Sequence, residues 1–96
     1  FSINEKAPSM DIGVKEKEYL SRVSQMFTDK GASFTSDNEL HEALYEIMHG
    51  LELKPGDVFP LCYGLLINKP KGPKLAGFMR TIGLEKVNEL IKGVLA

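Results

Sequence analysis

Hydrophobic side chains recur every three or four residues along most of the chain, and strict alternation of apolar and polar residues is absent. A period near 3.6 residues is typical of amphipathic α-helices, whereas a period of two is typical of strands. The pattern therefore predicts five helices and no strand. The expected helices lie at about residues 12–30, 36–51, 55–67 and 73–82, and the fifth runs through residues 87–95.

Residues at the expected helix ends agree with this division. Ser36, followed three residues later by Glu39, has the form of a capping box, in which each side chain accepts a hydrogen bond from an amide at the start of the helix. Pro55 suits a first helical position because the amide that proline lacks has no helical partner there. Pro60 is expected within about the first turn of the same helix, for the same reason. Asn68 tolerates the left-handed conformation that ends many helices.

Short connections between amphipathic helices favour antiparallel neighbours. We therefore expect an all-α fold, an irregular antiparallel helical bundle of about five helices. A chain of 96 residues closes a single hydrophobic core, so residues 1–96 are interpreted as one domain. Within it, residues 1–10 are expected to be an extended or disordered lead-in, and residues 11–96 to form the helical bundle.

The composition is that of an ordinary globular domain, with 43% hydrophobic and 26% charged residues. The single cysteine, Cys62, excludes a disulfide framework and a cysteine-rich metal site, and its apolar neighbours predict a core position. A reducing, cytoplasmic setting fits this cysteine usage. No apolar run approaches the roughly 20 residues of a membrane helix, so no membrane contact is expected. The chain begins with Phe1 rather than methionine, which favours its interpretation as a fragment.

One stretch of the sequence partly matches a known metal-binding pattern. The stretch His41-Glu42-Ala43-Leu44-Tyr45 resembles the zinc-protease motif HExxH, but tyrosine replaces the second histidine. His49 lies two helical turns from His41, too far away to share a small ion. The three glutamates of this expected helix line one face instead of converging across a pocket. We expect no catalytic residue, no metal and no cofactor in this chain.

The net charge of −1 hides an asymmetry along the chain. Residues 1–52 carry five Lys/Arg and ten Asp/Glu, a balance of −5, whereas residues 53–96 carry seven and three, a balance of +4. The basic cluster of the second half consists of Lys69, Lys71 and Lys74, with Lys54 and Arg80 expected on the same side. A loop that enters a helix adds free backbone amides and favours phosphate. A nucleic-acid surface and an ordinary solvated loop are the two interpretations of this cluster.

Several short motifs occur in order between residues 36 and 95. They are the helical stretch 40–46, Leu53-Lys54-Pro55-Gly56-Asp57-Val58-Phe59, then Tyr63, Gly72-Pro73-Lys74-Leu75 and Thr81-Ile82-Gly83. This ordered set resembles the C-terminal region of class I lysyl-tRNA synthetases. Asn68 stands where that family usually has glycine. Glutamyl-tRNA synthetases end with a similar Gly-Pro motif, so that single piece is compatible with either parent.

The resemblance implies a helical bundle that helps to recognise the anticodon stem-loop of lysine tRNA. In that family a Rossmann-type catalytic domain with HIGH- and KMSKS-like motifs binds ATP and lysine, and neither motif occurs in this sequence. ATP is therefore expected only in the parent protein, and this chain alone is expected not to aminoacylate. The candidate RNA contacts are Lys54, Lys69, Lys71, Lys74 and Arg80 for phosphates, and Phe34 and Tyr45 for stacking on unpaired bases.

Two other functions are compatible with the residues. A helical protein-interaction or structural module without RNA binding would use the acidic first half against a basic partner, or against the missing catalytic domain. A large exposed apolar patch would favour that function. A small stand-alone enzyme would need polar groups that converge in a pocket, and the sequence offers no such set.

Overall fold

The computed structural model describes residues 2–96 and contains helices and no strand in that range. The all-α prediction is confirmed, while Phe1, part of the expected lead-in, lies outside the described residues. The elements are α1 Val14–Lys30, a 3-10 turn η1 Gly31–Ser33, α2 Asp37–Gly50, α3 Pro55–Ile67, α4 Leu75–Ile82 and α5 Leu84–Leu95. Each expected helix is present, and the first begins at Val14 rather than near Ile12.

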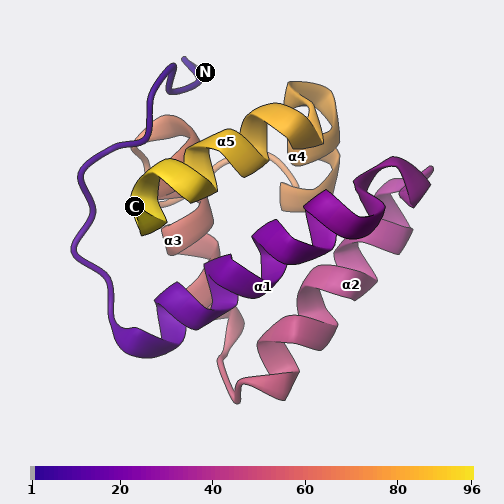
Figure 1. Cartoon of the computed structure of the whole chain (residues 1–96), viewed down its shortest axis with the longest axis horizontal. Coiled ribbons are helices and arrows are strands. Elements are labelled where there is room, and N and C mark those ends of the chain that lie inside the picture. The colour runs from indigo at the N-terminus through magenta and orange to yellow at the C-terminus, as the bar shows by residue number, and fades with distance from the viewer. Residues whose placement is uncertain (1) are drawn as a thin grey trace.

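The helices pack around one core (Figure 1). α1 and α2 run side by side in opposite directions, α5 lies along α1, also in the opposite direction, and α4 packs on α2 and α5. α3 lies behind these helices in the view of Figure 1 and packs against α1, α4 and α5. The side chains that are almost completely buried come from all five helices, and they include Tyr19, Leu20, Leu40, Met48, Leu65, Leu66, Met79, Leu90 and Ile91. In residues 2–96, no helix is both long enough and apolar enough to cross a membrane.

The start of α2 is capped in a modified form of the predicted box. The Ser36 hydroxyl accepts the amide hydrogen of Glu39 at 3.2 Å, which satisfies one of the unpaired amides of the first turn. The Glu39 carboxylate accepts from the hydroxyls of Thr35, at 2.8 Å, and Ser36, at 3.3 Å. The return bond of the box therefore comes from side-chain hydroxyls rather than from the backbone amide that the motif predicts.

The start of α3 also follows from its sequence. Pro55 is the first helical residue, and the Asp57 carboxylate accepts the Lys54 amide hydrogen at 3.0 Å. Pro60 is the sixth residue of α3 and so lies in its second turn, later than expected. The carbonyl of Gly56 consequently loses its helical donor. Both residues are exposed, so water can serve that carbonyl instead.

Residues 2–13, which we call the N-terminal strap, precede α1 without forming a helix. Asn4 covers the C-terminal end of α3, because its backbone amide donates to the Leu66 carbonyl at 2.7 Å and its side chain donates to the Leu65 carbonyl at 2.9 Å. These carbonyls belong to the last turn, where no helical amide follows to bond them. The strap therefore supplies the C-terminal cap of α3 from a position about sixty residues earlier in the chain.

The strap also crosses α5. The Lys86 ammonium donates to the Glu5 carbonyl at 2.5 Å, and a Cβ built on Gly93 would lie 2.4 Å from the Cβ of Ala7. The missing side chain of Gly93 makes the room through which the strap passes, because any larger residue would displace Ala7.

Candidate functional site

The segment between α3 and α4, residues 68–74, is exposed at every position, and we call it the lysine loop. Asn68 enters it in the left-handed conformation, with φ 57° and ψ 32°, which confirms the predicted end of α3. Asparagine adopts this conformation more readily than most residues, which explains how it can stand where the resembling family usually has glycine.

Two contacts with Tyr63 fix the far half of the lysine loop. The Tyr63 hydroxyl donates to the carbonyl of Pro73, across ten residues. The loop also passes directly over the tyrosine ring, because a Cβ built on Gly72 would lie 2.9 Å from two ring carbons. Burial raises the pKa of Tyr63, with the neighbouring Cys62 as a smaller cause, so this hydroxyl keeps its proton and remains a donor at neutral pH.

The predicted basic residues lie on different elements of the fold. Lys69 directly follows the C-terminal cap of α3, and Lys74 is the N-terminal cap residue of α4, so both ends of the lysine loop carry a cation. Lys54 lies at the opposite end of α3. The thirteen residues of α3 separate Lys54 from Asn68, where the loop begins, by about 20 Å along the helix, at about 1.5 Å per residue. The far half of the loop returns over Tyr63, so a shared side for Lys54 and the loop stays a prediction.

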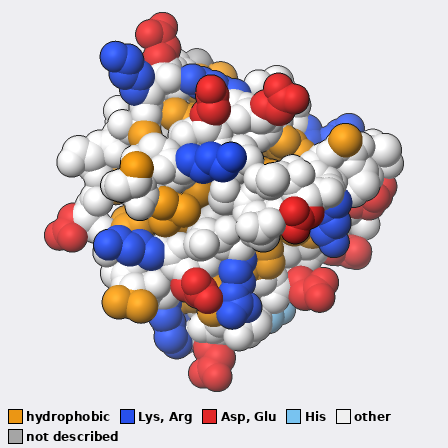
Figure 2. Space-filling view, in the orientation of Figure 1, with side chains coloured by type: hydrophobic (Ala, Val, Ile, Leu, Met, Phe, Trp, Pro, Cys, Tyr) orange, Lys and Arg blue, Asp and Glu red, His pale blue; other side chains and the backbone are white. Residues whose placement is uncertain are grey.

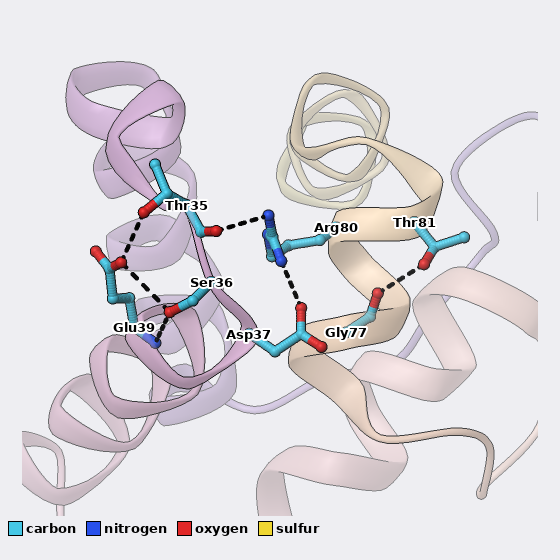
Figure 3. Close-up of polar contacts among 7 residues, drawn as sticks. All are labelled: Thr35, Ser36, Asp37, Glu39, Gly77, Arg80 and Thr81. Carbon is cyan, nitrogen blue, oxygen red and sulfur yellow. Dashed lines mark hydrogen bonds and ion pairs between the residues drawn. The ribbon is translucent and has the colours of Figure 1, made fainter.

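Arg80 is engaged within the protein (Figure 3). Its guanidinium donates to the Asp37 carboxylate at 2.7 Å and to the Thr35 carbonyl at 3.1 Å. The two contacts tie α4 to the start of α2, and we call them the Arg80 clamp. Gly77 faces Asp37 from α4, and a Cβ there would lie 2.9 Å from the carboxylate, so glycine lets the two helices approach. The Arg80 side chain retains 34% of its exposure, and its first role in this structure is to join helices.

Beside the clamp, a hollow of about 660 Å³ opens between α2, α3 and the first turn of α4. We call it the aromatic hollow because rings from α2 and α3 form one wall. Small residues of α4, Ala76 and Gly77, also line it. Its lining is His41, Tyr45, Phe59 and Tyr63 from the ring side, Asp37 and Asn38 from the start of α2, and Gly72, Lys74, Leu75, Ala76 and Gly77 from the loop and α4.

The rings of the hollow form a connected row. Tyr45 stacks on His41 with ring centroids 4.2 Å apart, and it meets Phe59 at 5.9 Å with the planes tilted by 60°. Phe59 continues the row to Tyr63 at 6.4 Å. Tyr45 and Phe59 are half-buried, so part of each ring surface faces the hollow, whereas Tyr63 is buried. Aromatic pairs of this tilted kind are energetically favourable.

Sequence reasoning identified only Tyr45 and Lys74 among the residues that line this hollow. It missed Phe59, Tyr63 and His41. A usable signal was present, since aromatic rings recur at four-residue spacing on two neighbouring helices. Phe34, the other predicted stacking residue, lies elsewhere. It is half-buried and lines a separate hollow together with Lys92 and Arg80.

The remaining surfaces offer less definite chemistry. Figure 2 shows the face formed by α1 and α5, where Lys/Arg and Asp/Glu side chains are interspersed. A shallow apolar hollow on α1 is bordered by Leu51 and Leu95, and next to them Val14 is 86% exposed. No three His, Cys, Asp or Glu side chains in residues 2–96 are grouped so as to hold a metal ion. Cys62 is buried at 1% exposure, as predicted for a core residue.

Comparison with known proteins gives the chain a family context. No protein-family model matches it. It is similar to the lysine–tRNA ligase of Methanocaldococcus jannaschii, with 37% identity over 73 residues that make up 76% of this chain and 13% of that protein. The lysine–tRNA ligase of Methanosphaera stadtmanae is 28% identical over 82 residues, 85% of this chain and 15% of that protein. That of Borreliella burgdorferi is 28% identical over 90 residues, 94% of this chain and 17% of that protein.

These relatives define the chain as an all-helical module related to the aminoacyl-tRNA ligases. Within that class, the chain is related to a segment of the lysine–tRNA ligases, and it spans less than a fifth of the length of the three relatives described.

Proposed function

We propose that this chain is the tRNA-binding part of a class I lysine–tRNA ligase, placed toward its C-terminus, and that it contacts the anticodon stem-loop of lysine tRNA. The observation that carries the proposal is the position of the lysine loop at the rim of the aromatic hollow, with Lys74 lining both. A phosphate-binding loop beside a surface of rings is the combination that unpaired RNA requires.

The chemistry of the two parts is complementary. Lysine ammonium groups attract backbone phosphates without regard to sequence, and they make binding depend on salt because each contact releases condensed counterions. Half-exposed rings take the flat faces of bases that are not paired in a helix. An anticodon loop presents both features within a few nucleotides, so one small module is able to serve it.

The parent enzyme supplies everything else in this proposal. ATP and lysine bind to a catalytic domain outside these residues, this module performs no chemistry itself, and that domain packs against it as the second partner. The setting is the cytoplasm, where tRNA is charged. Phe34, Lys54 and Arg80 remain weaker candidate contacts, since they lie outside the lysine loop and Arg80 takes part in internal contacts.

The proposal is tested by measuring binding of lysine tRNA to the chain over a range of salt concentrations. Replacing Lys69, Lys71 and Lys74 together by alanine should weaken binding and make the slope of log K against log salt shallower by about 2–3, because three phosphate contacts are lost. A control with the same change of charge replaces three exposed lysines of α1, Lys15, Lys17 and Lys30. The control should keep the wild-type slope.

Two results would contradict the proposal in different ways. An unchanged slope in the loop variant removes the lysine loop from the interface. Absence of binding by the wild-type chain at low salt removes the RNA role altogether. That second result would favour the alternative of a helical protein-interaction module, for which the exposed Val14 beside its apolar hollow is the supporting observation.

A further inference from the structure

The aromatic hollow has the features of a site for a single nucleotide base. We propose that one unpaired base of the RNA leaves its neighbours and rests in this hollow against the ring faces of Tyr45 and Phe59, while Lys74 holds its phosphate. This inference rests on the proposed function. It assigns a nucleotide base to the hollow as its ligand, which the lysines alone do not specify.

The walls of the hollow favour a flat heteroaromatic ligand. One wall is formed by Tyr45 and Phe59, which are half-buried and held in place by each other at 5.9 Å and by His41 and Tyr63 on either side. Ala76 and Gly77, which also line the hollow, carry little or no side chain and so leave room for a flat ligand. A preformed row of rings loses little conformational freedom when a base stacks on it, which favours binding.

The ring geometry also limits where the base lies. Tyr45 and Phe59 are too close together, and too strongly tilted at 60°, for a base to enter between them as in a sandwich. His41 already covers one face of Tyr45 at 4.2 Å. The base therefore extends the row on the side of the hollow, touching the open parts of both half-buried rings.

The polar rim of the hollow adds directional contacts. The Asn38 amide offers both a donor and an acceptor at the start of α2, which suits the Watson–Crick edge of a base. The Asp37 carboxylate is partly satisfied by the Arg80 clamp at 2.7 Å, so it adds less negative charge to the rim than a free carboxylate would. Lys74 completes the rim with a cation for the phosphate of the same nucleotide.

The test uses hairpin RNAs with the sequence of the lysine tRNA anticodon stem-loop, each carrying 2-aminopurine at one loop position. Stacking on a ring changes the fluorescence of this base. We expect a large change at one loop position on binding to the wild-type chain, and small changes at the others. Equal changes at all positions, or none despite binding, would overturn the single-base site.

Variants separate this inference from the proposed function. Tyr45→Leu and Phe59→Leu keep an apolar side chain but remove the ring, and each should weaken hairpin binding about tenfold or more while leaving the salt slope unchanged. Phe78→Leu is the matched control, because Phe78 is also a half-buried aromatic but does not line this hollow. It should bind like the wild type.

A failure of the base site and a failure of the lysine loop as a phosphate-binding site give different results. If the leucine variants bind normally while the loop variant still loses salt dependence, the RNA role stands and the base site is wrong. Tyr45→Phe keeps the ring without its hydroxyl and should bind within about twofold of the wild type. This variant shows whether the ring alone is sufficient at this position, and circular dichroism shows whether Tyr45→Leu is folded. Should both leucine variants lose their helical circular dichroism, the position-dependent fluorescence of the wild-type complex decides the matter alone.

Discussion

Helix α3 and the lysine loop are adjacent in the chain and are specified in opposite ways. Seven of the thirteen residues of α3 are buried, among them Leu65 and Leu66 at 0% exposure, whereas all seven residues of the loop are exposed. α3 is held by the removal of apolar surface from water. The loop has no such burial, so its path depends on a few individual contacts at its two ends.

This difference explains why the two regions tolerate change differently. The stability of a core helix depends on the volume and hydrophobicity of its buried side chains. The closely packed residues around it share the small shifts that a substitution causes. The path of the exposed lysine loop depends instead on the backbone conformation of Asn68 and on the hydrogen bond from the Tyr63 hydroxyl to the Pro73 carbonyl. Loops that are positioned by a rigid frame and are free of core packing are common places for binding residues.

The largest effect is expected in α3. Leu66→Ala should lower the free energy of unfolding by about 2–5 kcal/mol, because the lost methyl groups leave a cavity in a packed core. The measurement is urea unfolding followed by circular dichroism. Lys71→Ala in the lysine loop is the comparison, with an expected change of no more than about 0.5 kcal/mol because its side chain is exposed. Equal losses in the two variants would refute the contrast.

A second effect concerns the dependence of stability on pH. Burial raises the pKa of the Cys62 thiol from 9.0 to about 12. Between these values the unfolded chain carries a thiolate and the folded chain a thiol, so unfolding releases a proton and the free energy of unfolding falls as pH rises. Cys62→Ala lacks this contribution. The stability advantage of the wild type over Cys62→Ala should shrink from about pH 8 to about pH 10, and a constant difference would show that the thiol titrates normally when folded.

The smallest of these effects is expected at the junction of the two regions. Tyr63→Phe removes the hydrogen bond to the Pro73 carbonyl and should cost about 1 kcal/mol of stability. The loop should also open more often, so trypsin should cleave after Lys71 faster than in the wild type. Tyr19→Phe is the matched control, since its hydroxyl bonds the Leu44 carbonyl far from the loop along the chain. Faster cleavage in both variants would mean that general stability, rather than the loop contact, controls access.

Much of this fold was predictable from sequence, because each helix is marked both by its apolar period and by residues at its ends. Ser36, Pro55 and Asn68 mark boundaries that the structure confirms. The capping of α3 by Asn4 was not predictable in the same way. That contact joins residues far apart in the chain, and no local pattern distinguishes Asn4 from an asparagine in water.

The candidate site was less predictable than the fold. The charge pattern located the lysine loop, but it also included Lys54, which lies at the other end of α3, and Arg80, which pairs with Asp37. Charge counted along a sequence does not tell a cation that joins helices from one that faces solvent. The row of rings depends on the packing of α2 against α3, so only one of its members, Tyr45, was identified beforehand.

The N-terminal strap has a consequence for the order in which the molecule assembles. Its bond from Lys86 to Glu5 spans 81 positions, and Asn4 reaches its acceptors on α3 across about sixty. Closing a long loop costs conformational entropy. A contact between residues this far apart offsets that cost only when the distant helix has already formed. During synthesis the strap precedes α3 and α5, yet it can make these contacts only after both helices have emerged, so within residues 2–96 a segment made early is among the last to be placed.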